Sequence, residues 1–437
     1  MARLFRLNLI RRFISSYREE GPGEAFRKAR TYTGMKLRKL GAGTIGQTAQ
    51  GVARSDDQYL HGIWQDLARK EAFHIMTAPA VLQKRRQIAM IGDLNLPQCR
   101  KYRVEQLAAF WQGRGVDFEY SHYQDVPRSA RIMQNATHLM EYRLQTMPVT
   151  EMFRYEARRL RLPVLYDLDD PLFSVSAYET YRNMESVGAK LKAHFLSEAP
   201  KYLGMMNGAD ILQVSTPGMV EHTGLYTSRP VYLRRNFADQ ETLDAGRLAM
   251  ATRPEDDGIF RVAFASGSQG HEIDLAEILE PLAAFILDDP NRRLMVIGHF
   301  KPEHLPEGLI KQVETTKFGT YALYLEALAR ANCAVMPLCD DIFNRCKSAV
   351  RVLDASAVAV PSLVGTVGDL AAVVKHDQTG FVCAQPADWI EALEALAADP
   401  ALQRKLGQAA REELETRWHG SDGTHIISPE ILKWVEA

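Results

Sequence analysis

The stretch PLCDDIFNRCKSAVRVLDASAVAVPSL, residues 337–363, carries the unit from which the fold can be read. The apolar residues 333–338 predict a short buried strand, and residues 348–357 have the spacing of a helix. A further apolar run, 358–364, predicts the next strand. A strand, a loop, a helix and a strand in this order indicate a parallel sheet, because parallel strands need a crossover connection.

The same alternation continues on both sides of this unit. It predicts two doubly wound, Rossmann-like α/β domains, over residues 86–240 and 259–420, with a linker at 241–258 and a last helix within 421–437. In open α/β sheets, ligands bind beyond the carboxyl ends of the strands. We therefore expect the chemistry in loops that follow strands, where the two domains face each other across a cleft. The further candidate strands are 87–91, 118–120, 138–141, 163–166, 210–214, 231–234, 261–265, 293–297 and 380–383, and the helices between them include 102–112, 149–160, 181–205, 275–287, 321–331 and 389–398.

The composition is globular and nearly neutral. The 437 residues are 46% hydrophobic and 24% charged, and 53 Lys and Arg against 54 Asp and Glu leave a net charge of −1. These values exclude a collagen-like or wholly disordered chain and a small disulfide scaffold. Without a basic excess, nothing favours nucleic acid as a partner. The five cysteines are scattered without a CxxC pair, which indicates a reduced, cytoplasmic chain.

The basic charge is concentrated at the start of the chain. Residues 1–40 hold 11 Lys and Arg against three acids, a net of +8, so the remaining 397 residues carry −9. Within RLFRLNLIRRFISSY, residues 3–17, apolar residues recur at helical spacings among arginines, which is typical of a helix that lies on a membrane surface. We expect a basic helical extension over residues 1–85 that meets an anionic membrane, on the inner face of the cell membrane, through residues 1–40. A helix packed on the body with a solvated charged face is the alternative.

Small residues and a histidine mark the loop after the strand predicted at 261–265. Gly267 and Ser268 leave room for a ligand to approach the backbone closely. His271 stands at the mouth of the following helix, where backbone N–H groups favour a phosphate. An ordinary strand-to-helix turn in which His271 only caps the helix is the alternative.

The loop within residues 337–363 supplies a second set of polar side chains. Asn344 lies in the loop, and Lys347 and Ser348 open the predicted helix. A cation and a hydroxyl at a helix N-terminus attract anions by charge and by the helix dipole. Asp354 follows about two turns later on the same helix. A solvated lysine on a packed helix is the alternative.

Three carboxylates crowd the loop after the strand predicted at 163–166. In PVLYDLDDPLF, residues 163–173, Asp167, Asp169 and Asp170 lie within four residues and repel one another unless something compensates their charge. A DxD site would hold a nucleotide-sugar through Mg²⁺ or Mn²⁺. A metal-free site would use a carboxylate to accept sugar hydroxyls. A strand-end turn with a helix-capping Asp is the third reading.

Taken together, these motifs make the second half resemble the C-terminal domain of bacterial glycosyltransferases of the GT-B fold, in the GT4-like or group 1 family. The resemblance covers about residues 260–418 and includes SGSQGHEIDL at 266–275, the stretch at 337–363, and TGFVC with ADWIEALEALAADPALQRKLGQAA within 379–410. The first half resembles such enzymes more weakly, mainly through YDLDDPLF at 166–173.

The family resemblance implies transfer of a sugar from a nucleotide-sugar, bound mainly by the second half, to an acceptor bound mainly by the first. Retention of the anomeric configuration is usual, and no metal or other cofactor is usually required. Lys347 would neutralise the diphosphate, and Asp354 would bind the donor ribose. Asp169 falls near the position of the family's catalytic His. The implied residues are Asp169, Asp167 and Lys347 for catalysis, and Gly267, Ser268, His271, Asn344, Lys347, Ser348 and Asp354 for the donor, with no metal site.

The chain departs from the family pattern at several positions. Cys346 replaces the first of two acids, and Ala359 and Val360 stand where a Gly is expected before Pro361. The basic residues that many relatives carry in the SGS loop are also absent.

We expect a glycosyltransferase that acts on a saccharide or lipid-linked saccharide in bacterial surface polysaccharide biosynthesis. The alternative is a non-catalytic subunit of a polysaccharide assembly complex that binds a sugar-nucleotide or a glycan. The altered site at Cys346 would suit that alternative, whereas Lys347 and Asp354 favour the enzyme.

Overall fold

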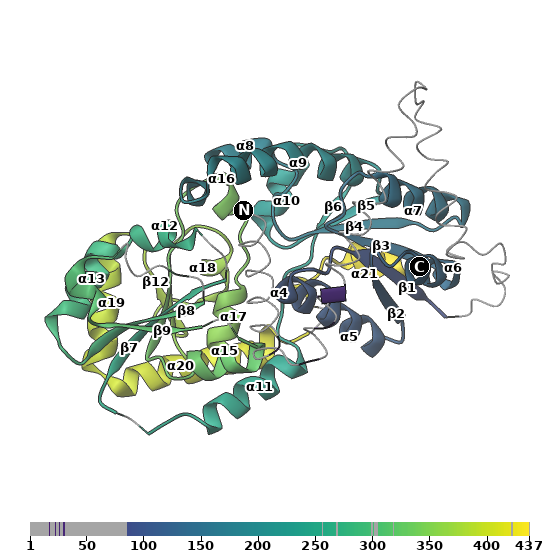
Figure 1. Cartoon of the computed structure of the whole chain (residues 1–437). Helices are drawn as coiled ribbons and strands as arrows, with labels where there is room; N and C mark the ends of the chain where they lie inside the picture. The colour runs from purple at the N-terminus through teal and green to yellow at the C-terminus, as the bar shows by residue number, and fades with distance from the viewer. Residues whose placement is uncertain are drawn as a thin grey trace. The chain divides into compact units, whose positions relative to one another are not determined.

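Two parallel sheets of six strands each organise this protein, whose structure is a computed structural model (Figure 1). The structure describes residues 85–436, except 256, 268–269, 299, 301–304, 318 and 421–422, and in addition residues 17, 22, 26, 29 and 30. The described residues from 85 onward belong to one compact unit. The basic helix predicted at 3–17 and nearly all of the extension predicted at 1–85 therefore lie outside the described residues.

The N-terminal sheet has the strand order β2-β1-β3-β4-β5-β6, with every pair parallel. The order reverses between β1 and β3, and at this carboxyl edge Tyr142 of β3 lies opposite Asp167 of β4. The residues that follow these two strands are thereby brought side by side. The strands are β1 Gln87–Gly92, β2 Asp117–His122, β3 His138–Tyr142, β4 Val164–Leu168, β5 Ile211–Val214 and β6 Val231–Leu233.

The C-terminal sheet has the order β12-β11-β10-β7-β8-β9 and is also parallel throughout. Its order reverses between β7 and β10, which is where an open α/β sheet binds ligands. The strands are β7 Phe260–Ser266, β8 Arg292–Gly298, β9 Val313–Thr316, β10 Cys333–Met336, β11 Ser362–Val364 and β12 Gly380–Val382.

Helices cover both faces of the C-terminal sheet (Figure 1). Val262 and Phe264 of β7 pack into the core on the side of helices α13 and α19, whereas Ala263 packs on the side of α15 and α17. This alternation explains why the strands read as apolar runs, since a parallel sheet is buried on both faces. In the N-terminal domain the helices and turns are α4 Pro97–Arg100, η2 Lys101–Glu105, α5 Gln106–Gly113, α6 Val126–Asn135, α7 Pro148–Arg159, α8 Val175–Thr180, η3 Arg182–Glu185, α9 Ala189–Asn207 and α10 Pro217–Gly224. The later helices are α11 Gln240–Ala251, α12 His271–Ala276, α13 Leu279–Asp288, α14 Glu307–Ile310, α15 Tyr321–Leu328, α16 Ile342–Arg345, α17 Val350–Ala357, α18 Leu370–Val373, α19 Pro386–Ala398, α20 Pro400–Arg417 and α21 Pro429–Glu436.

Several predicted boundaries differ from the structure. The segment 241–258, predicted as a linker, contains most of helix α11, whose Leu243 carbonyl accepts a hydrogen bond from Arg411 of α20. The helix predicted at 181–205 is broken into the η3 turn and helix α9. Strand β11 begins at Ser362 rather than at 358, because Ala359 has a φ of +54° in the turn after α17. The family resemblance predicts a Gly near this residue. Glycine adopts such a left-handed backbone at no steric cost, which explains the prediction.

The last helix returns to the N-terminal domain. Ile431 and Val435 of α21 join the core cluster of β1, and the Trp434 ring lies against His138 with centroids 4.7 Å apart. The chain therefore crosses between the domains twice, and an antiparallel bridge joins Arg234 and Ile427 where the two crossings meet. None of the described helices is both long and apolar enough to span a bilayer.

Candidate functional site

Asp274 joins the loops that lie where the strand order of the C-terminal sheet reverses, between β7 and β10. Its side chain is fully buried on helix α12, after β7. One carboxylate oxygen accepts from the backbone N–H of Cys339, after β10, and from Asn344 Nδ2, both at 3.0 Å. The other oxygen accepts from His271 at 2.9 Å. Although burial opposes ionisation, these donors hold the pKa of Asp274 below its ordinary value, so the carboxylate ties the two loops together as an anion.

His271 is oriented by this carboxylate. Its Nδ1 bonds to Asp274, which can only accept, so Nδ1 carries the proton and Nε2 remains to meet a ligand. The ring lies within electrostatic reach of Arg351, Lys347 and Asp170. Burial, with the two cations, lowers the pKa of His271, although Asp274 opposes the shift. The nearby cations Lys347 and Arg351 support the prediction that His271 lies at an anion site.

Lys347 lies between the two domains. Its Nζ is 3.1 Å from Asp170 Oδ1 of the N-terminal domain and 4.7 Å from the centroid of the Phe343 ring. Burial acts to lower the pKa of Lys347, but the Asp170 carboxylate outweighs it and raises the pKa, so this lysine is a cation. The helix that follows begins at Val350, two residues later than predicted. Ser348 precedes it and accepts a hydrogen bond from Asn236 Nδ2 at 3.1 Å.

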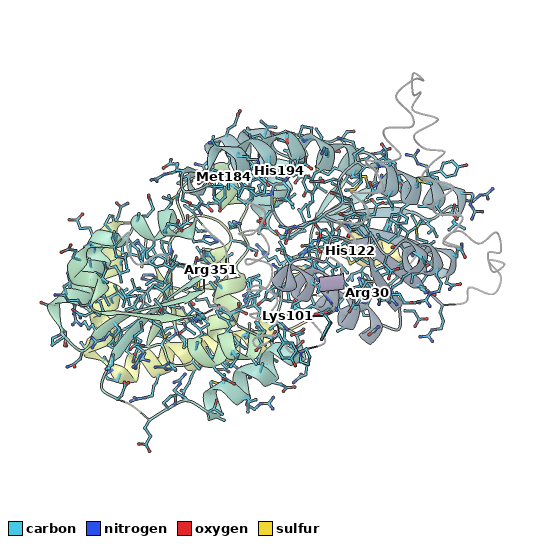
Figure 2. All side chains as sticks on the ribbon, viewed as in Figure 1. Arg30, Lys101, His122, Met184, His194 and Arg351 are labelled. Carbon is cyan, nitrogen blue, oxygen red and sulfur yellow. The ribbon has the colours of Figure 1, made fainter. Side chains whose placement is uncertain are left out.

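Arg351 adds a cation that the sequence analysis did not single out. It projects from helix α17, four residues after Lys347, and donates to the carbonyl of Ala265 in β7 at 3.4 Å (Figure 2). Burial lowers the pKa of Arg351, while Asp274 opposes that shift. Spacings of three and four residues share a helix face. Asp274 follows His271 by three residues on helix α12, which is the signal that would have found Asp274, whereas Lys347 precedes helix α17 and shares no helix face with Arg351.

The acidic loop after β4 is paired with Arg143, directly after β3. Arg143 donates to Asp169 at 2.6 Å and to Asp170 at 2.7 Å, and the Tyr142 hydroxyl donates to Asp169 at 3.0 Å. Burial acts to raise the pKa of Asp170, but Lys347 and Arg143 hold it below its ordinary value. Arg143 has a φ of +51°, a conformation that costs a non-glycine residue about 1–2 kcal/mol and is found at functional sites.

Asp167 has a different environment from its two neighbours. Its side chain has 0% exposure inside the N-terminal domain. Arg103 donates to both of its oxygens at 2.8 Å, and Gln213 also donates to it. Asp167 and Asp169 thus each face an arginine, whereas a DxD site needs carboxylates free to hold a metal. Asp167 is therefore occupied by contacts inside its own domain, and its predicted catalytic role stays a prediction.

Asp354 lies on helix α17 and is only 4% exposed. Its Oδ1 accepts from Tyr102 of the N-terminal domain at 2.6 Å and from Tyr321 of helix α15 at 2.8 Å. The Lys101 ammonium lies 4.4 Å from the centroid of the Tyr321 ring. Burial raises the pKa of Asp354 to about 6, against the effect of these donors. Ribose hydroxyls would have to share this carboxylate with the two tyrosines.

The remaining predicted donor residues have separate outcomes. Asn344 is fully buried and bonds to Asp274 and Asp341, so it supports the site from behind. Gly267 is exposed, and a Cβ added there would find nothing within 4 Å, which leaves space for a ligand. Ser268 lies outside the described residues. The roles of all these residues stay predictions.

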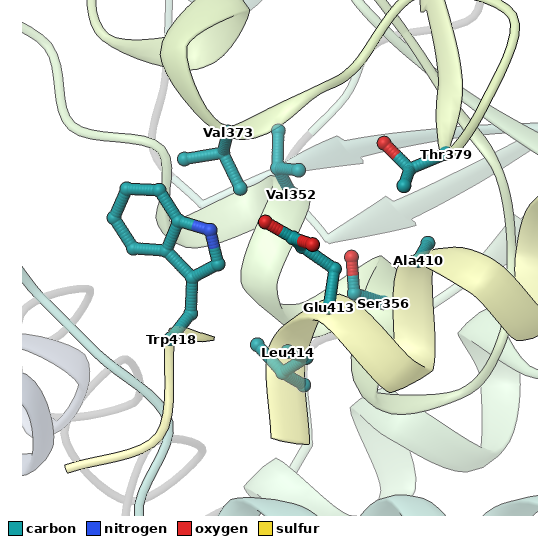
Figure 3. Close-up of a pocket in the computed structure, with 8 residues that line it drawn as sticks. All are labelled: Val352, Ser356, Val373, Thr379, Ala410, Glu413, Leu414 and Trp418. Carbon is teal, nitrogen blue, oxygen red and sulfur yellow. The ribbon is translucent and has the colours of Figure 1, made fainter. Parts of the chain in front are cut away.

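A small pocket of the C-terminal domain lies on another face of helix α17 (Figure 3). Val352 and Ser356 of that helix line it, together with Val373, Thr379, Ala410, Glu413, Leu414 and Trp418. Glu413 is paired with Lys375 at 2.6 Å. None of these lining residues belongs to the site described above, so this pocket reads as incomplete core packing.

The arrangement brings cations of the C-terminal domain against carboxylates of the N-terminal domain. Lys347 and Arg351 can stabilise negative charge beside the N-terminus of helix α17, and Nε2 of His271 can accept a hydrogen bond there. Asp169 and Asp170 can accept hydroxyl protons or hydrogen bonds on the opposite side. Such a site suits a ligand with an anionic part and a hydroxyl-rich part.

Comparisons with known proteins give a family model for part of the C-terminal domain and solved structures that share the fold. Residues 262–399 match the family model described as glycosyl transferases group 1. Sucrose-phosphate synthase from Thermosynechococcus elongatus is similar in structure at 14% identity and a TM-score of 0.53, over 80% of this chain and 98% of that chain. HepE of Anabaena, in complex with UDP and glucose, is similar at 10% identity and a TM-score of 0.51, over 81% and 100% of the two chains. WaaG, a glycosyltransferase involved in lipopolysaccharide biosynthesis, is similar at 14% identity and a TM-score of 0.50, over 80% and 98%. The predicted GT-B fold of two Rossmann-like domains is confirmed.

Proposed function

We propose that this chain is a glycosyltransferase of group 1, which moves a sugar from a nucleotide-sugar to a saccharide or lipid-linked saccharide with retention of configuration. The observation that carries the proposal is the pairing of Lys347 with Asp170 between the two domains at 3.1 Å. This contact puts a cation suited to a diphosphate beside a carboxylate loop suited to sugar hydroxyls.

In the proposed reaction, the bond between the anomeric carbon and the phosphate oxygen breaks, and a bond to the acceptor oxygen forms. Negative charge grows on the leaving diphosphate, and Lys347 and Arg351 stabilise it in a site shielded from water, while Nε2 of His271 can accept a hydrogen bond from a hydroxyl of the donor sugar. The acceptor hydroxyl loses its proton to the leaving phosphate or to a carboxylate. Asp169, held by Arg143 and Tyr142, is the carboxylate proposed to orient the sugar or accept that proton.

We propose no cofactor beyond the donor itself. The carboxylates that would form a DxD metal site are paired with arginines, Asp167 with Arg103 and Asp169 with Arg143. Among the described residues, no group of three or more His, Cys, Asp or Glu side chains is arranged to hold a metal ion.

A role in surface polysaccharide synthesis, with peripheral attachment to a membrane, completes the proposal. Its supports are the net charge of +8 over residues 1–40 and the fold shared with WaaG, which acts in lipopolysaccharide biosynthesis. A basic segment gains about 1 kcal/mol per Lys or Arg near an anionic leaflet. Lipid-linked acceptors would be met at such a surface.

The test incubates the full chain with UDP-, GDP- and TDP-sugars and a panel of saccharide and lipid-linked acceptors. We expect one donor to release its nucleoside diphosphate and to extend an acceptor by one sugar, seen by mass spectrometry, with NMR giving the configuration of the new bond. EDTA should leave the rate unchanged. Tight donor binding with neither transfer nor hydrolysis would instead favour the non-catalytic subunit, for which the buried Cys346 in place of an acid is the supporting observation.

A further inference from the structure

A short segment of the N-terminal domain inserts against the ligand loops of the C-terminal domain. The Tyr181 ring stacks on Phe343 of helix α16, with centroids 4.2 Å apart and planes 10° from parallel. The η3 turn follows it and contacts helix α12. Gly270, which precedes α12, has a φ of +103°, and a Cβ there would lie 2.9 Å from the Asn183 carbonyl oxygen. The two segments therefore approach so closely that the C-terminal domain requires a glycine at position 270.

Asn183 of this segment reaches the buried centre of the site. Its Nδ2 donates to Asp274 Oδ2 at 2.7 Å and to the Tyr181 hydroxyl at 3.0 Å. Asn183 is only 1% exposed, and its Oδ1 has no hydrogen-bond partner among the described residues. A buried, unpaired amide oxygen costs about 1–3 kcal/mol. The side chain of Asn183 therefore contributes through the hydrogen bonds that its nitrogen donates, while its buried oxygen lowers the stability of the fold.

The same carboxylate oxygen that accepts from Asn183 also accepts from His271. Asp274 thus links a donor from the N-terminal domain to the imidazole beside Lys347 and Arg351. Two donors on one oxygen fix the carboxylate, and the carboxylate fixes the plane and the tautomer of the imidazole. If the domains separate, Asn183 leaves with its own domain while His271 and Asp274 remain together.

We propose that Asn183 is a positioning residue that acts through Asp274 to fix the imidazole of His271, so that its unprotonated Nε2 accepts a hydrogen bond from a hydroxyl of the donor sugar. The inference rests on the proposed function and adds to it a link between the approach of the two domains and the position of the donor sugar. The sugar would then be fully oriented only in the closed cleft, from which water is excluded.

A double-mutant cycle tests the link. Asn183→Ala, His271→Ala and the double variant are compared in kcat and in donor KM. Asn183→Leu keeps a similar side-chain shape but removes the donor without adding a charge beside Asp274, so it serves if the alanine variant folds poorly, as judged by circular dichroism. Arg182→Ala is the matched control, because it breaks the exposed pair of the same segment with Glu277, at 2.6 Å, without touching Asp274.

We expect Asn183→Ala to lower kcat about tenfold, the effect of losing one hydrogen bond to a charged group, with donor KM changed less than threefold. The double variant should be no slower than His271→Ala alone. Arg182→Ala should leave kcat within twofold of wild type. In combination with His271→Ala, the loss in kcat should equal the product of the two single losses.

Independent effects would overturn the inference. If the double variant loses the product of the two single losses, Asn183 does not act through His271. An unchanged kcat in both Asn183 variants would also overturn it. Neither result touches the proposed function, which fails only if the wild-type chain transfers no sugar from any donor in the panel.

Discussion

Replacing Lys347 by methionine removes a charge from the candidate site while keeping most of the side-chain length. The ammonium lies 3.1 Å from Asp170 and its side chain is 24% exposed. Asp170 retains its bond to Arg143 at 2.7 Å in the variant, so no carboxylate is left unpaired. The fold should therefore tolerate the change, with the free energy of unfolding lowered by no more than about 3 kcal/mol, the contribution of one hydrogen bond between charged groups.

The expected loss of activity follows from the distance and the environment. At 3.1 Å and an effective dielectric constant of about 20, two unit charges attract by about 5 kcal/mol before desolvation. Hydrogen bonds to charged groups retain about 1.5–3 kcal/mol of this attraction. If the donor diphosphate receives a similar bond from Lys347, its loss lowers kcat/KM by about 10- to 150-fold.

The assay measures steady-state release of nucleoside diphosphate with the donor identified in the panel. Arg345→Ala is the matched control, because this neighbouring cation is paired at the surface with Asp340 and both side chains are more than 60% exposed. The control should stay within twofold of wild type. An unchanged kcat and an unchanged KM in Lys347→Met, in a variant that is folded at the assay temperature, would refute the assignment of Lys347 to the diphosphate.

Three further predictions concern other parts of the chain. Asp169→Asn should lower kcat more than it raises donor KM, since this carboxylate faces the reacting sugar in the proposed mechanism; equal effects on donor binding and rate would contradict it. Burial raises the pKa of Asp354 to about 6, so the native state binds more protons than the unfolded chain between about pH 4 and pH 6, and stability falls as pH rises through that window. Across this window the free energy of unfolding, measured by denaturant melts, should fall by up to about 3 kcal/mol in wild type and should not fall in Asp354→Asn. An equal fall in the variant would show that another group causes it. Full-length protein should co-sediment with anionic vesicles at low salt and less at high salt, whereas deletion of residues 1–40 should abolish sedimentation and spare donor binding; equal sedimentation of the truncated chain would make the arm a packing element.

The fold was predictable because its strands are buried on both faces and therefore read as apolar runs. Strand β9, Val313–Thr316, escaped this signal, since its sequence VETT is partly exposed and holds one apolar residue. The helix predicted at 181–205 has continuous helical spacing, but the structure interrupts it at the η3 turn. Gly188, which directly precedes helix α9, is the local signal for that break, whereas the contacts of the η3 segment with Phe343 and Asp274 lie far along the chain and leave no local pattern.

The candidate site was predictable where a motif and a strand end coincide. Lys347 and His271 come from loops that the parallel topology brings to one edge of the sheet. Arg143 and Asn183 carry no such signal, because their roles arise from a pairing across β3 and β4 and from a contact between domains. Long-range partners of this kind are fixed only by tertiary packing.

The charges at the domain interface also limit how a diphosphate can bind. Arg143 is shared by Asp169 and Asp170, and Lys347 is drawn toward Asp170. A diphosphate at Lys347 therefore adds negative charge beside a carboxylate, and only cations not already paired can offset it. Arg351 is one such cation, since within the described part of the chain it donates to a backbone carbonyl, that of Ala265, rather than to an acid. The hydroxyls of the donor sugar can lie between phosphate and Asp170 and donate to both, which would favour a sugar diphosphate over a free nucleotide at this position.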